Sequence, residues 1–84
     1  MAEVVMYSTG YCPYCMRARE LLQQKKVLFT DIRIDLQPEL REEMLQKSHR
    51  HTVPQIFING QHIGGCDDLY ALEAQGKLDQ LLKG

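Results

Sequence analysis

The chain has 84 residues, of which 44% are hydrophobic and 25% are charged. This length and composition predict one globular domain, residues 1–84, with a small hydrophobic core. Its 10 basic and 11 acidic side chains leave a net charge of −1, so no general attraction to nucleic acid or a membrane surface is expected. The sequence has neither a signal peptide nor an apolar run long enough to cross a bilayer, so we expect a cytoplasmic protein.

The first half of the chain alternates strand and helix patterns. Residues 4–7 predict a strand, and a helix follows with Pro13 in its first turn. Its expected apolar face consists of Cys15, Ala18, Leu21, Leu22 and the aliphatic stem of Lys25. Residues 28–34 predict a second strand. The side chains expected on one face of this strand are Leu28, Thr30, Ile32 and Ile34.

The second half begins with a helix that Pro38 is expected to open and that ends within residues 49–52. Its expected apolar stripe consists of Leu40, Met44 and Leu45. Residues 54–63 predict a β-hairpin whose Asn59-Gly60 pair suits a type I′ turn. A third helix is expected to begin near Asp67 as its N-cap and to end before Gly76, followed by a short helical tail.

The predicted element order is β-α-β-α-β-β-α. The first two strands are joined through a helix and should be parallel, whereas the last two form an antiparallel hairpin. The expected fold class is therefore α/β, a mixed sheet flanked by helices.

Cys12 and Cys15 lie where the first strand gives way to the first helix. A Cys-x-x-Cys motif near a βαβ pattern is typical of thioredoxin-like redox sites. Cys12 precedes the helix, where the unpaired N–H groups and the dipole favour a thiolate, while Cys15 is enclosed by the apolar face. This asymmetry predicts that Cys12 attacks a disulfide and that Cys15 resolves the mixed disulfide.

Two other interpretations of the cysteine pair stay open. A zinc site would need two more ligands, such as Cys66 and His62, although the sequence lacks a second Cys-x-x-Cys pair. A structural disulfide across so short a loop would constrain the unfolded chain very little. A total of three cysteines cannot all pair, and the composition favours a reducing compartment.

Three motifs in this order, Cys12-Pro-Tyr-Cys15, Thr52-Val-Pro54 and Gly64-Gly-Cys-Asp-Asp68, resemble glutaredoxin over nearly the whole chain. The match is to the small bacterial dithiol type. The thioredoxin motif Trp-Cys-Gly-Pro-Cys is absent, since the chain has no Trp. The resemblance implies a thioredoxin-like fold with a four-stranded sheet. It further implies glutathione as co-substrate without a tightly bound cofactor, and reduction of protein disulfides or glutathionylated thiols by a monomer.

The resemblance also implies roles for individual residues. Cys12 would be the nucleophile and Cys15 its resolving partner, and no residue is expected to bind a metal. Val53 would pair its backbone with glutathione beside a cis peptide bond to Pro54. The residues expected to bind glutathione are Tyr14, Arg41, Thr52, Val53, Pro54, Gly65, Cys66, Asp67 and Asp68. Arg41 would contact the glycyl carboxylate, while Asp67 and Asp68 with the adjacent backbone would hold the γ-glutamyl end.

One position departs from the family pattern: many relatives have Lys where this chain has Thr9. Arg41 or another basic side chain would then share the role that this Lys has in the relatives. Two alternative functions remain from the sequence: an iron–sulfur cluster carrier in which two chains share a cluster, and a thioredoxin-type reductase that receives electrons from a flavoprotein. The three histidines fit ordinary surface positions, with His62 on the exposed face of the hairpin.

Overall fold

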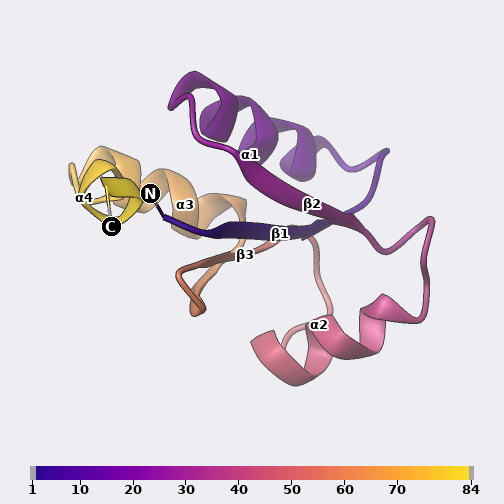
Figure 1. The fold of residues 1–84 in the computed structure, drawn as a ribbon. Coiled ribbons are helices and arrows are strands. Elements are labelled where there is room, and N and C mark those ends of the chain that lie inside the picture. The colour runs from indigo at the N-terminus through magenta and orange to yellow at the C-terminus, as the bar shows by residue number, and fades with distance from the viewer. Residues whose placement is uncertain (1, 84) are drawn as a thin grey trace.

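A four-stranded sheet with the strand order β2-β1-β3-β4 organises the computed structural model, which describes residues 2–83 (Figure 1). The elements in chain order are β1 (Val4–Ser8), α1 (Pro13–Gln24), β2 (Phe29–Arg33), α2 (Leu40–Ser48), β3 (Gln55–Ile58), β4 (Gln61–Gly64), α3 (Cys66–Ala74) and α4 (Leu78–Lys83). β1 pairs with β2 in parallel and with β3 antiparallel, and β4 pairs antiparallel with β3. The predicted α/β class, element order and mixed sheet are confirmed.

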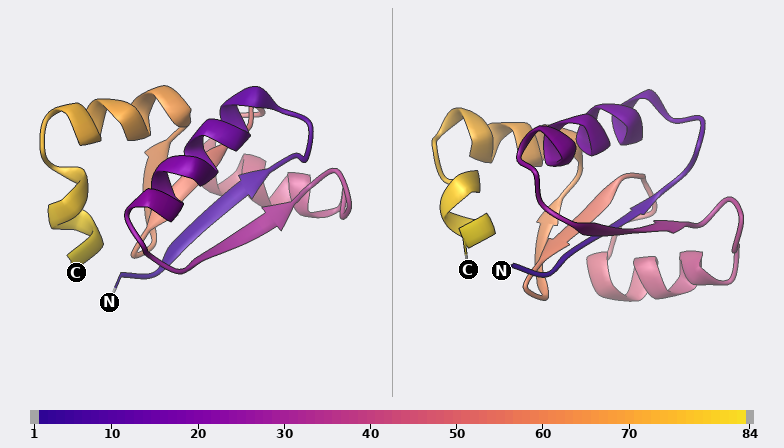
Figure 2. Two further views of the ribbon diagram at one scale, coloured as in Figure 1. Left: turned by 90° about the horizontal axis from the view of Figure 1, so that it is seen from above. Right: turned by 45° about the horizontal axis from the view of Figure 1, so that its top comes forward.

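The helices cover both faces of the sheet. α1 and α3 lie side by side on one face, and α2 lies on the other (Figure 2). Side chains alternate along β1 accordingly, because successive residues of a strand point to opposite faces. Val4 and Met6 join the cluster under α1 and α3, whereas Tyr7 joins Met44 and Phe57 on the α2 face. Among residues 2–83 no helix is long and apolar enough to cross a membrane.

Helix α1 presents the apolar face predicted for it. Its buried side chains are Cys15, Ala18, Leu21 and Leu22. Pro13 occupies the start of the helix, where a missing N–H costs nothing. Lys25 lies just beyond the helix as its C-cap, and its ammonium pairs with Glu73 at 2.7 Å and Asp79 at 2.9 Å. These ion pairs connect the end of α1 to α3 and α4.

Strand β2 is shorter than predicted. The ladder with β1 begins at the pair Val4 and Phe29, so Leu28 lies outside the strand and is 82% exposed. The prediction that Leu28 begins the second strand was therefore wrong, because periodicity does not show where pairing begins. Ile32 and Ile34 do share the α2 face, as the alternation predicted.

Helix starts differ from the predictions by one or two residues. α2 begins at Leu40 rather than at Pro38, because Pro38 and Gln37 form turns that precede it, with Leu40 N–H donating to the Gln37 carbonyl at 3.0 Å. α3 begins at Cys66 with Gly65 as N-cap, so the prediction of Asp67 as N-cap was wrong.

The turn glycines behave as predicted. Asn59 and Gly60 have φ values of 52° and 79°, which are the two positive angles that a type I′ turn requires. Gly76, directly after the Gln75 C-cap of α3, has φ of 73°. The hairpin turn sets the register of β3 and β4, and therefore where α3 starts.

Candidate active site

Cys12 is the N-cap residue of α1, and Cys15 lies one turn further along the same helix. The Cys12 side chain is partly exposed, and its Sγ lies 3.8 Å from the carbonyl oxygen of Val53. Cys15 is completely buried, and both thiols are free. The structure therefore places one sulfur where a substrate can reach it and the other behind it.

Burial raises the pKa of the Cys15 thiol to about 11. The neighbouring Cys12 also raises it, while the backbone N–H of Thr9 and the charge of Arg19 act in the opposite direction. Because a low-dielectric surrounding disfavours the charged form, Cys15 is a thiol at neutral pH. Its protonated state agrees with the asymmetry predicted from the sequence.

A groove of about 300 Å³ lies beside the cysteines. It is lined by Tyr14, Arg50, Thr52, Val53, Pro54, Gly65, Cys66, Asp67 and Asp68. Of the predicted glutathione residues, all but Arg41 lie in this lining. Arg50 lies in it too, although none of the sequence motifs includes it.

Close backbone approach shapes the groove. The bond between Val53 and Pro54 is cis. A Cβ on Gly65 would lie 3.3 Å from the Pro54 carbonyl oxygen, so a side chain there would press on this segment. Gly64 has φ of 122°, a conformation that essentially only glycine adopts. Glycine is therefore favoured at Gly64 by backbone geometry and at Gly65 by the proximity of Pro54.

Asp68 closes the far end of the groove with two contacts. Its carboxylate accepts the Gly65 N–H at 2.9 Å, which caps α3, and it lies 3.2 Å from Nη1 of Arg50. The Gly65 N–H and then Arg50 lower the pKa of Asp68. The carboxylate is thus charged and held at the start of the helix.

Arg41 lies outside the groove lining. Its Nη2 donates to the carbonyl oxygen of His51 at 3.2 Å, next to Thr52 in the chain. This bond steadies the segment that leads into the groove. Contact of Arg41 with a ligand carboxylate stays a prediction.

His62 is not the exposed surface residue that was predicted. Its ring is half-buried against Phe57, with Nε2 2.8 Å from the Gln55 side-chain oxygen, and burial lowers its pKa. The sequence could not show this, because the partner comes from the facing strand. In the part of the chain that the structure describes, no three His, Cys, Asp or Glu side chains gather as metal ligands, so the set proposed for zinc is not assembled.

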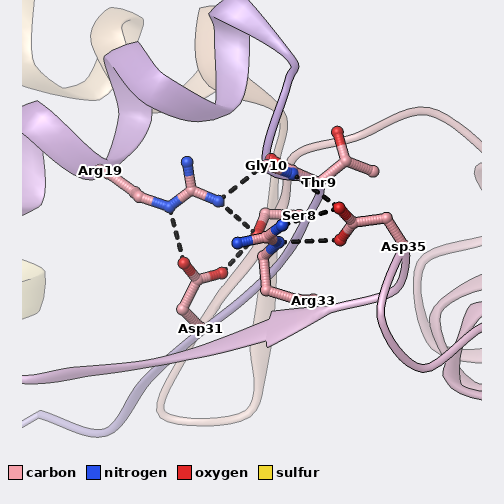
Figure 3. Close-up of polar contacts among 7 residues, drawn as sticks. All are labelled: Ser8, Thr9, Gly10, Arg19, Asp31, Arg33 and Asp35. Carbon is pink, nitrogen blue, oxygen red and sulfur yellow. Dashed lines mark hydrogen bonds and ion pairs between the residues drawn. The ribbon is translucent and has the colours of Figure 1, made fainter.

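Two arginine–aspartate pairs hold the loop between β1 and α1 (Figure 3). Arg19 Nε lies 2.6 Å from Asp31, and its Nη2 donates to Ser8 Oγ at 2.8 Å and to the Thr9 carbonyl at 3.1 Å. The Ser8 hydroxyl donates to Asp31 in turn. Because Arg19 follows Cys15 by one turn, this network ties the cysteine helix to the sheet.

The second pair, Arg33 and Asp35, holds the backbone at Gly10, two residues before Cys12. Arg33 donates to both oxygens of Asp35 at 2.8 and 2.7 Å, and Asp35 accepts the Gly10 N–H at 3.1 Å (Figure 3). Thr9 is buried between these pairs, and its hydroxyl has no partner among residues 2–83. Sequence reasoning missed both pairs, although the alternation of β2 does place Asp31 and Arg33 on the same face as each other.

A reactive cysteine at the start of a helix, a buried cysteine one turn later and a facing cis-proline segment define a thioredoxin-like dithiol site. The family model of Glutaredoxin matches residues 4–63. Glutaredoxin 3 of Escherichia coli is 59% identical over 83 residues, covering 99% of this chain and 100% of that protein. A glutaredoxin of Pseudomonas aeruginosa is 57% identical over 82 residues, covering 98% of both chains.

Solved structures agree with this result. A crystal structure of a buckwheat glutaredoxin–glutathione complex superposes with a TM-score of 0.90 at 34% identity, covering 98% of this chain and 77% of that one. The chain belongs to the glutaredoxin family. It is a glutathione-dependent thiol–disulfide oxidoreductase of the dithiol type.

Proposed function

We propose that Cys12 is the nucleophile of this oxidoreductase and that Cys15 is its resolving thiol. The observation that carries the assignment is the contrast between the two sulfurs. Cys12 is accessible beside the groove and Cys15 is fully buried one turn behind it. A substrate disulfide can therefore meet Cys12, while Cys15 is placed to react with the sulfur of Cys12.

The groove beside Cys12 is the proposed glutathione site. Its volume of about 300 Å³ and its wall at Thr52 and Val53, just before the cis bond to Pro54, suit a peptide that pairs with the backbone. At the far end, the first N–H groups of α3 have no acceptor within the helix, so they favour a carboxylate there. Asp67 and Asp68 supply negative charge for an ammonium group. In the proposed binding mode, the cysteinyl sulfur of glutathione lies beside Cys12 and its γ-glutamyl end lies beside α3.

Reduction of a glutathionylated thiol needs Cys12 alone. The Cys12 thiolate attacks the glutathione sulfur of the mixed disulfide, forming a bond to glutathione and releasing the substrate thiolate, which takes up a proton. A second glutathione, as thiolate, then attacks the bound glutathionyl sulfur. It leaves as oxidised glutathione and regenerates the Cys12 thiolate.

Reduction of a protein disulfide uses both cysteines. Cys12 attacks one substrate sulfur and forms a mixed disulfide with the protein. Cys15 then loses its proton and attacks the Cys12 sulfur, which releases the reduced protein and leaves a Cys12–Cys15 disulfide. Two glutathione molecules reduce this disulfide and leave as oxidised glutathione. The proposed partners are thus glutathione and proteins bearing disulfides or glutathionylated thiols, and the proposed acting form is a monomer.

The test compares wild type with two matched variants, Cys12→Ser and Cys15→Ser. The substrate is the mixed disulfide of glutathione and 2-mercaptoethanol, and NADPH consumption through glutathione reductase reports turnover. We expect wild type and Cys15→Ser to be active and Cys12→Ser to be inactive. On a protein disulfide, we expect only wild type to turn over efficiently.

Both variants replace one sulfur by oxygen, so each controls for the other. If Cys12→Ser turned over the mixed disulfide as fast as wild type, the nucleophile assignment would be contradicted. An inactive wild type that is reduced instead by a flavoprotein reductase would contradict the glutathione site.

A further inference from the structure

Arg50 enters the groove from a turn that is built independently of its side chain. Ser48 Oγ, which is buried, lies 3.1 Å from both the amide nitrogen and the carbonyl oxygen of Arg50, and 2.7 Å from the Met44 carbonyl. His49 between them is left-handed, with φ of 60°. The turn at the end of α2 therefore holds the Arg50 backbone and leaves its guanidinium free to act in the groove.

The guanidinium lies against Asp68. Nη1 of Arg50 is 3.2 Å from the Asp68 carboxylate, with the two side chains 49% and 47% exposed. Asp68 itself is fixed by the Gly65 N–H. Since the pair is half-exposed, its own contribution to stability is small, about 1 kcal/mol or less. An ion pair this weak can exchange its partners with an incoming ligand.

Arg50 is also the basic side chain of the groove. Among the described residues that line it, Arg50 supplies the one positive charge, and Asp67 and Asp68 supply negative charge. An anionic group that binds at this end of the groove can thus meet one side-chain cation. The same group would lie within reach of the unpaired N–H groups at the start of α3.

The γ-glutamyl end of glutathione is an α-amino acid zwitterion, with one ammonium and one carboxylate on the same carbon. We propose that Arg50 binds the α-carboxylate of this zwitterion, next to Asp68, which the resemblance to glutaredoxin already assigns to the γ-glutamyl end and which would bind the ammonium. This inference rests on the proposed glutathione site and identifies a specificity-determining residue within it. On binding, the Arg50–Asp68 ion pair opens, and each charge exchanges one opposite charge for another. A ligand with only one of the two groups leaves one side chain without its partner.

The experiment measures binding of three unreactive ligands to the full reduced chain by isothermal titration calorimetry. The ligands are S-methylglutathione, its glutaryl analogue, which lacks the ammonium, and its 4-aminobutyryl analogue, which lacks the α-carboxylate. The variants are Arg50→Ala and Arg50→Lys. The matched control is Lys47→Ala, which removes one positive charge from an exposed side chain that pairs with Glu43 on α2.

We expect Arg50→Ala to weaken S-methylglutathione and the glutaryl analogue by roughly fivefold to tenfold, the range of a charged hydrogen bond in a half-exposed site. The same variant should bind the 4-aminobutyryl analogue at least as well as wild type does, because that ligand offers Arg50 nothing and the variant has no Arg50–Asp68 ion pair to open. Arg50→Lys should restore part of the loss, and Lys47→Ala should bind all three ligands like wild type.

Equal weakening of all three ligands by Arg50→Ala would overturn the proposal, since it would show a general effect of charge or structure. Unchanged binding of all three would overturn it as well. Failure of wild type to bind S-methylglutathione would instead contradict the proposed glutathione site itself. Circular dichroism and thermal melting of each variant separate a folding defect from a lost contact.

Discussion

Cys15 lies one helical turn behind Cys12 with no exposed surface, whereas Cys12 is partly exposed and its sulfur lies 3.8 Å from the Val53 carbonyl oxygen. The two thiols of one motif therefore experience different surroundings. Burial protects Cys15 from reagents and keeps it protonated, and the position of Cys12 at the start of the helix leaves it partly exposed. The proposed order of reaction, Cys12 first and Cys15 second, rests on this difference.

The first prediction concerns thiol reactivity. Iodoacetamide at neutral pH should alkylate Cys12 and leave Cys15 unmodified, as shown by mass spectrometry of peptides. In a Cys12→Ser variant, the alkylation rate of Cys15 should rise with pH well beyond the ordinary thiol pKa of 9.0, because burial, the largest cause, remains. Denaturing urea is the control and should make Cys15 reactive. Rapid modification of folded Cys15 at neutral pH would contradict its burial.

The same raised pKa of Cys15 predicts how the free energy of unfolding changes with pH. The folded Cys15 holds its proton up to a pKa of about 11, while an unfolded thiol loses it near 9.0. The unfolded state thus binds fewer protons in this window, so the free energy of unfolding should fall as pH rises from about 9 to about 11. Urea denaturation of reduced wild type and Cys15→Ala across this window checks the sign, since the alanine variant should lack this part of the decline.

The second prediction concerns Gly64. An alanine there would keep φ near 122° and would place its Cβ against the Asp68 carboxylate that caps α3. We expect Gly64→Ala to lower the free energy of unfolding by about 3 kcal/mol and to weaken glutathione binding, because both the strand end and the cap must shift. Gly76→Ala is the matched control, since its φ is also positive but its surroundings are open. It should cost only about 1 kcal/mol, and an equal cost for both would contradict the steric argument.

The third prediction concerns the Arg19 network. Arg19→Ala removes bonds to Asp31, Ser8 and the Thr9 carbonyl, and should lower the free energy of unfolding by about 2 kcal/mol. Arg17→Ala on the same helix is the control, because Arg17 is exposed and lies only over the Tyr70 ring. Its loss should be under about 1 kcal/mol.

A double-mutant cycle of Arg19→Ala with Asp31→Ala, followed by urea denaturation, measures the coupling directly. We expect a coupling energy of about 1 kcal/mol or more. Strictly additive losses would show that the pair does not hold α1 to β2.

The fourth prediction concerns the buried Thr9 hydroxyl, which has no hydrogen-bond partner among residues 2–83. Thr9→Val replaces this hydroxyl by a methyl group of similar shape, so it should raise the free energy of unfolding by about 1 kcal/mol. Thr30→Val, at the exposed position of β2, is the control and should change it by no more than about 0.5 kcal/mol. A destabilised Thr9→Val variant would mean that the hydroxyl is bonded in the folded state.

Local patterns were sufficient for most of the fold. The buried face of α1, the alternation of Ile32 and Ile34 and the Asn59-Gly60 turn all appear as predicted, because they depend on residues that are neighbours in the chain. The errors lie where an element begins. Leu28 falls outside β2 because pairing with β1 decides where the strand starts, and α3 starts earlier than predicted because the Asp68 carboxylate caps it.

The resemblance of three motifs to glutaredoxin implied most of the residues that line the groove. The sequence by itself determined the order of strands and helices and the cysteine pair at the start of α1. These depend on periodicity, turn residues and motifs, which are local properties of the chain. Only the tertiary structure decided that Arg50 meets Asp68, that Arg19 meets Asp31 and that the His62 ring is half-buried beside Gln55. Each of these pairs joins side chains of different elements, so its geometry exists only once the sheet has brought those elements together.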